Sequence, residues 1–77
     1  MMQIAIRKTL FNRKGQEVDQ QIIETLALRE KGEARFYLGQ NLYLPETSLN
    51  RDVPQMDGTT IRWELATQED KDNFSKL

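Results

Sequence analysis

Residues 17–31 read EVDQQIIETLALREK, and the conformation of this stretch decides the fold of the chain. Most of these residues are good helix formers. Val18, Ile22 and Leu26 recur at a spacing of four, which would give a helix one apolar stripe. Gly32 stands where a C-terminal glycine commonly ends a helix. We therefore predict a helix over residues 17–31.

The same stretch has a second interpretation as a β-strand. Ile22, Leu26 and Leu28 share one alternating parity, and Lys31-Gly32 could form a hairpin turn into the next segment. No good helix N-cap precedes the stretch, and Leu28 lies off the helical stripe. The prevalence of helix formers favours the helix, and the strand remains the alternative.

The segments on either side give clearer patterns. Alternation of apolar and polar residues predicts strands over residues 3–11, 34–38, 42–44 and 60–65. Thr67 is a good N-cap, and Asp70 three residues later completes a capping box. A short helix is therefore predicted from Thr67 to Leu77.

The two central strands are expected to form a hairpin with a three-residue loop at Gly39-Gln40-Asn41. This loop keeps the two faces consistent, because it pairs Leu38 with Leu42, Tyr37 with Tyr43 and Phe36 with Leu44. Residues 46–58 show no periodicity and are predicted to be a long loop. Its apolar residues, Leu49, Val53 and Met56, are expected to fold back over the edge of the core, and a contact surface is the alternative.

These elements predict one α+β domain over residues 1–77, in the order β-α-β-β-β-α. Its sheet is expected to have three or four antiparallel or mixed strands, with the helices packed on one face. The predicted core is the apolar parity of the strands, namely Ile4, Ile6, Phe36, Leu38, Leu42, Leu44, Ile61 and Trp63.

The composition argues against several classes of function. The chain contains no histidine and no cysteine, the residues that carry most nucleophilic, metal-binding and near-neutral acid–base chemistry. We predict no catalytic residue, no metal site and no cofactor. No apolar run approaches the length of a membrane span, so neither membrane partner nor signal segment is expected, and a chain without cysteine suggests the cytoplasm.

The candidate binding site is the sheet face opposite the core. The same alternation that buries the apolar parity turns five side chains outward, namely Arg7, Arg35, Tyr37, Tyr43 and Arg62. Tyrosine and arginine are enriched in protein interfaces. The same residues could also stack unpaired bases and hold phosphates, but 11 basic against 12 acidic residues give a net charge of -1, which disfavours nucleic acid.

The acidic residues near the last helix have a structural interpretation. Glu64, Glu69, Asp70 and Asp72 cluster where a helix begins, so capping and the helix dipole explain them better than catalysis or cation binding does. The sequence therefore predicts a small non-enzymatic regulatory protein of the phage- or plasmid-accessory type that binds a protein partner. A module for single-stranded nucleic acid is the alternative, and an edge strand or the Tyr/Arg face could serve a homodimer.

Overall fold

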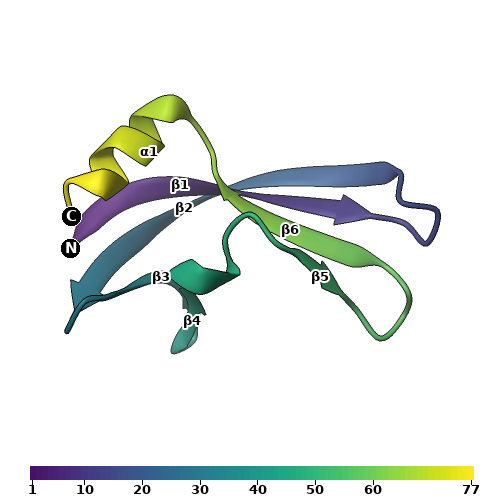
Figure 1. Cartoon of the computed structure of the whole chain (residues 1–77), viewed down its shortest axis with the longest axis horizontal. Helices are drawn as coiled ribbons and strands as arrows, with labels where there is room; N and C mark the ends of the chain where they lie inside the picture. The colour runs from purple at the N-terminus through teal and green to yellow at the C-terminus, as the bar shows by residue number, and fades with distance from the viewer.

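The computed structural model describes residues 1–77 as a six-stranded antiparallel sheet that curls into a half-barrel, with one short C-terminal helix (Figure 1). The predicted α+β fold, with three or four strands and helices on one face, is therefore wrong. The strand order is β4-β3-β2-β1-β6-β5. The elements are β1 Met2–Phe11, β2 Glu17–Glu30, β3 Glu33–Gly39, β4 Leu42–Pro45, the 3-10 turn η1 Glu46–Ser48, β5 Asp52–Pro54, β6 Thr60–Leu65 and α1 Gln68–Ser75.

The largest correction concerns the helix predicted over residues 17–31, because Glu17–Glu30 form the long strand β2 and Lys31 begins a turn. Lys31 and Gly32 both have positive φ, 53° and 86°, as a two-residue hairpin turn requires. The β-branched pair Ile22-Ile23 favours an extended backbone. β2 pairs with β1 along most of its length, and this tertiary pairing overrides the helix propensity of the segment.

The core lies on one face of the sheet, called here the inner face. Phe36 stands opposite Ala27 on β2 and Leu44 on β4, and the buried residues Ile4 and Ile6 on β1 continue this face. Four of the eight predicted core residues are buried. Leu38, Ile61 and Trp63 are partly buried, whereas Leu42 is 61% exposed and was wrongly assigned to the core. The buried apolar residues are Ile4, Ile6, Ala27, Ala34, Phe36, Leu44, Ala66 and Phe74.

The β3–β4 hairpin explains why Leu42 leaves the core. Tyr37 pairs with Tyr43 and Phe36 with Leu44, as predicted. Nearer the turn the register shifts, so that Gly39 rather than Leu38 pairs with Leu42. The turn itself is the two residues 40–41, both with positive φ. A bulge beside a two-residue turn thus replaces the expected three-residue loop.

The predicted long loop at residues 46–58 contains the 3-10 turn η1 and the short strand β5. Leu49 packs against the core and forms an isolated bridge with Trp63, as expected of a core cap. Val53 and Met56 are 39% and 107% exposed, so they do not belong to this cap. The expected cap therefore holds for Leu49 alone.

The last helix begins as predicted. Thr67 is the N-cap, and Asp70 completes a reciprocal capping box with it. The helix ends at Ser75, two residues short of the predicted end. Its buried residue Phe74 stacks on Phe36 with 5.0 Å between ring centroids, so α1 closes one end of the inner face.

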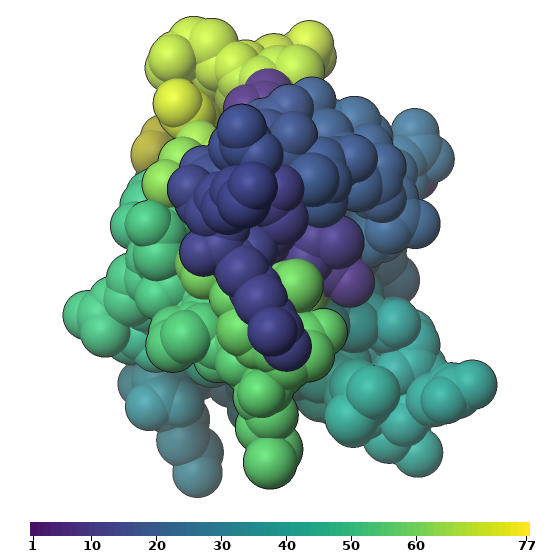
Figure 2. Space-filling model, turned by 90° about the vertical axis from the view of Figure 1, so that its right-hand side faces the viewer, coloured from purple at the N-terminus to yellow at the C-terminus, as the bar shows by residue number.

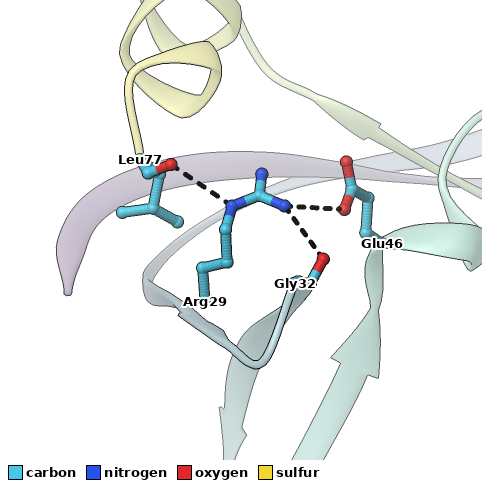
Figure 3. Close-up of polar contacts among 4 residues, drawn as sticks. All are labelled: Arg29, Gly32, Glu46 and Leu77. Atoms are coloured by element: carbon cyan, nitrogen blue, oxygen red, sulfur yellow. Dashed lines mark hydrogen bonds and ion pairs between the residues drawn. The ribbon is translucent and has the colours of Figure 1, made fainter.

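One arginine holds three segments together at this end of the sheet (Figure 3). The Arg29 Nε donates to the Leu77 carbonyl at 3.2 Å, and its Nη1 donates to the Gly32 carbonyl at 3.3 Å. The same Nη1 lies 3.7 Å from a carboxylate oxygen of Glu46. The guanidinium also lies 5.6 Å from the centroid of the Phe74 ring. Arg29 thereby ties the end of α1, the β2–β3 turn and η1 to one another.

At the opposite end of the molecule, two turns lie against each other. Figure 2 shows the β1–β2 turn, in dark blue, reaching over the β5–β6 turn, in green. The Arg13 Nε donates to the Asp57 carbonyl at 2.8 Å across this contact. An arginine side chain thus links separate segments at each end of the molecule, Arg29 at one end and Arg13 at the other.

Candidate binding surface

The structure turns all five predicted site residues to the face opposite the core, called here the outer face. Arg7 lies on β1, Arg35 and Tyr37 on β3, Tyr43 on β4 and Arg62 on β6. The strand registers place all five on this face, because in their strands these residues alternate with the residues that point toward the core. The five do not form one cluster, since β2 separates the β3–β4 residues from those on β1 and β6.

The β3–β4 group is an aromatic pair with an arginine beside it. The Tyr37 and Tyr43 rings have centroids 5.2 Å apart at an interplanar angle of 55°. The Arg35 guanidinium lies 5.6 Å from the Tyr43 ring centroid, and its Nη2 lies 3.2 Å from a carboxylate oxygen of Glu30. Tyr43 is 43% exposed. The group therefore offers a rigid aromatic surface with a guanidinium that already has an anionic partner.

The β5–β6 group is built around Arg62. Its guanidinium donates to both carboxylate oxygens of Asp52, at 2.6 and 3.2 Å, and lies 4.9 Å from the centroid of the Phe11 ring. The hydrogen bond from Arg62 is the main cause that lowers the pKa of the Asp52 carboxyl below its ordinary value of 3.8. Arg62 is thus already paired with a carboxylate of the same sheet.

This ion pair predicts a specific titration. The pKa of Asp52 is lower in the folded state than in the unfolded state. The stability that the pair contributes is therefore fully present above the unfolded pKa and is lost as the pH falls through the folded pKa. Replacing Arg62 by glutamine should raise the NMR titration midpoint of Asp52 toward 3.8. The matched variant Arg35→Gln should leave that midpoint unchanged. Identical midpoints in the wild type and in Arg62→Gln would contradict the assignment.

Arg7 joins the outer face to the start of α1. Its Nη2 donates to the carbonyl of Ala66, just before the helix N-cap, and Arg7 stands opposite Glu64 in the β1–β6 register. Each of the three predicted arginines therefore has a hydrogen-bond acceptor within the chain. None of them is a free cation on an otherwise neutral surface.

Between these groups runs an apolar stripe that the sequence interpretation missed. Val18, Ile22 and Leu26 on β2 are 54%, 54% and 41% exposed. Ile22 stands opposite Arg7 on β1, so the stripe shares the outer face with the arginines and tyrosines. Gln20 and Glu24 alternate with the three aliphatic residues along this side of β2. The outer face therefore has an aliphatic centre and an arginine- and tyrosine-rich rim.

The helix prediction concealed this stripe, because it turned the same three residues toward the core. The shared parity of Ile22, Leu26 and Leu28 and the Lys31-Gly32 turn pointed to a strand, and the β-branched pair Ile22-Ile23 is a further signal in the sequence. In a strand, Ile23, Thr25 and Ala27 take the inner side and leave the stripe outside.

Among the acidic residues near α1, Asp70 has a clear structural role. The carboxylate of Asp70 accepts the backbone N–H of Ala5 at 3.2 Å and that of Thr67 at 3.2 Å. No group of three or more histidine, cysteine, aspartate or glutamate side chains could hold a metal ion. The larger of two hollows, about 210 Å³ beside the β2–β3 turn, is smaller than typical cofactor pockets.

No protein-family model, curated protein or solved structure matches this chain. None of its helices is long and apolar enough to cross a membrane.

Proposed function

We propose that this protein is a small non-enzymatic regulatory module whose outer face binds a protein partner, as phage or plasmid accessory proteins do. The observation that carries this proposal is the exposed stripe of Val18, Ile22 and Leu26 at the centre of a face rimmed by tyrosine and arginine. An aliphatic centre with a tyrosine and arginine rim matches the composition of protein interfaces. We assign the interaction to the cytoplasm, because the chain has no cysteine and disulfides are rare in cytosolic proteins.

The energetics support an apolar partner surface. Burying the exposed half of each aliphatic side chain in the stripe contributes about 1 kcal/mol. The Tyr37–Tyr43 pair adds rigid contact area at a low cost in side-chain entropy. The proposed partner therefore presents an apolar ridge that lies along β2, with its flanks against the tyrosines.

The charges favour a protein over a single-stranded nucleic acid. Arg62 would have to give up Asp52, and Arg35 would have to give up Glu30, before either could bind a phosphate. Glu24 stands within the stripe and would repel a phosphate backbone. An apolar ridge on a protein partner would bind without breaking either ion pair and without repulsion from Glu24.

The test compares three baits in affinity capture from the native host, followed by quantitative mass spectrometry. The outer-face variant is Leu26→Ser with Tyr43→Ser, two residues that are 41% and 43% exposed. The control is Val53→Ser with Met56→Ser, which also removes two exposed apolar side chains but lies on β5 and its following turn. Exposed substitutions of this kind cost about 0.5 kcal/mol each, so both variants should fold.

The expected result is a protein that the wild type and the control retain and that the outer-face variant loses at least about tenfold, equivalent to roughly 1.4 kcal/mol. Equal recovery by all three baits would contradict the proposal. A labelled single-stranded oligonucleotide provides the second arm. Tight binding that weakens steeply with salt would assign the face to nucleic acid instead.

A further inference from the structure

We infer that the open edge of β2, residues 17–24, binds an extended basic segment of a partner protein as an additional antiparallel strand. The inference concerns backbone hydrogen bonds at an edge of the sheet. It does not rest on the proposed function of the outer face, which depends on side chains.

The first observation is that the N-terminal half of β2 has a neighbouring strand on one side only. β2 spans Glu17–Glu30, but β3 pairs only with residues 27–30 of it. Just beyond that pairing, the Thr25 hydroxyl donates to the Tyr37 carbonyl, so the edge is occupied from Thr25 onward. Residues 17–24 have β1 on one side and no strand on the other.

The contacts of Ala5 show which backbone groups of this edge are free. Ala5 donates its N–H to Asp70 and accepts the N–H of Ala66, so both of its backbone groups point away from β2. Ala5 stands opposite Glu24, and the direction of backbone groups alternates along an antiparallel pair. The residues of the edge that direct both N–H and C=O away from β1 are therefore Glu24, Ile22 and Gln20.

The second observation is that this edge lacks the protection of the two terminal strands of the sheet. β4 has four residues and ends at Pro45, and β5 has three residues and ends at Pro54. Short strands and prolines usually protect an edge against further pairing. Residues 17–24 contain no proline, glycine, lysine or arginine. The backbone of this edge is therefore suited to accept another strand.

The charge of the edge determines which strand fits it. Glu17, Asp19 and Glu24 are its charged residues, and none of them forms a salt bridge within the chain. A second copy of this chain would bring three more carboxylates to the same edge, and the repulsion disfavours that occupant. Lysine or arginine opposite Asp19 and Glu24 instead gives one opposite-charge pair on each face of the sheet.

The residues between these charges specify the rest of the segment. Ile22 is 54% exposed, and Ile23 is partly buried against the core. A β-branched aliphatic residue opposite each of them would cover its exposed surface. Threonine suits the positions opposite Gln20 and Gln21. Opposite residues 24 to 19, the complementary segment is therefore lysine, valine, valine, threonine, threonine and lysine.

The first test adds a capped peptide of that sequence to the wild-type protein and follows amide hydrogen exchange by NMR. The N–H groups of Gln20 and Ile22 are open in the free protein, so saturating peptide should slow their exchange at least about tenfold. Gln21 and Ile23 direct their N–H groups to β1 and should be protected before the peptide is added. A peptide with glutamate in place of both lysines should protect neither Gln20 nor Ile22.

The second test removes one backbone donor and measures the affinity of the labelled peptide by fluorescence anisotropy. Gln20→Pro deletes an N–H that β1 does not use, and an edge strand tolerates proline at such a position. The matched control Gln20→Ala removes the same side chain and keeps the N–H. The proline variant should bind at least about tenfold more weakly than the alanine variant, with circular dichroism confirming that both are folded.

A third variant keeps the backbone intact in case the proline variant does not fold. Asp19→Lys with Glu24→Lys should reverse the preference, so that the glutamate peptide binds more tightly than the lysine peptide. Leu26→Ser with Tyr43→Ser should bind the lysine peptide as the wild type does, which separates this edge from the outer face.

Four results would each overturn the inference. They are unchanged exchange of Gln20 and Ile22 in the presence of peptide, equal affinities of the two folded Gln20 variants, equal binding of the lysine and glutamate peptides to the wild type, and slower exchange of the same two amides on raising the protein concentration alone. The last result would assign the edge to a second copy of this chain.

Discussion

Phe36→Ala is expected to lower the free energy of unfolding by about 3–5 kcal/mol, the usual loss for deleting a fully buried aromatic side chain. Phe36 has no exposed surface and stacks on Phe74. It also lies between Ala27 and Leu44 in the strand register, so the substitution leaves a cavity bounded by three strands and the helix. Denaturant titration followed by circular dichroism measures the effect.

The control is Leu42→Ala in the partner strand of the same hairpin. Leu42 is 61% exposed, so its loss should change the free energy of unfolding by no more than about 0.5 kcal/mol. Equal losses in the two variants would mean that the bulge at Gly39 does not turn Leu42 out of the core.

Asp70→Ala is expected to be the most damaging polar substitution, at about 2 kcal/mol or more. The carboxylate caps α1 through Thr67 and also accepts the N–H of Ala5, so its loss frees donors on both the helix and β1. Amide hydrogen exchange at Ala5 should accelerate together with that of the first turn of α1.

Asp72→Ala provides the comparison within the same helix. Asp72 accepts one exposed hydrogen bond from Gln68, and its removal should cost no more than about 0.5 kcal/mol. If both aspartate variants lose the same stability, the contact between Asp70 and β1 contributes nothing.

Local chemistry was enough to predict several parts of the fold. The alternation in residues 3–11 and 60–65 identified two strands, and Thr67 with Asp70 identified the start of the helix. The Tyr37–Tyr43 pair followed from keeping the faces of a hairpin consistent. Each of these inferences used residues that are close in sequence, where propensity and pattern agree.

The central segment could not be assigned in this way, because a spacing of four residues is ambiguous. Val18, Ile22 and Leu26 share one face of a helix, and they also share one face of a strand because four is a multiple of two. What separates the two structures is the other parity, where Ile23, Thr25 and the fully buried Ala27 line the inner face. The small side chain of Ala27 leaves room for Phe36, which pairs with it, and this relation between two strands is not visible in any local pattern.

The candidate surface was also predicted only in part, because some of its features depend on how distant strands pair. The parity of Arg7, Arg35 and Arg62 follows from their own strands, so their placement on the outer face needed no knowledge of β2. The ion pairs of Arg35 and Arg62 and the aliphatic stripe depend on how the strands pair, and the sequence interpretation had a helix in place of β2.

The strand order also determines how this chain reaches its structure. The pairs β1–β2, β2–β3, β3–β4 and β5–β6 each join neighbours along the chain, whereas β1 with β6 joins residues as distant as Ile6 and Leu65. Closing that long loop carries the largest entropic cost, so we expect the hairpins to form first and the docking of β6 on β1 to limit the folding rate. Substitutions that weaken this one seam should slow refolding, while those in β4 should mainly accelerate unfolding.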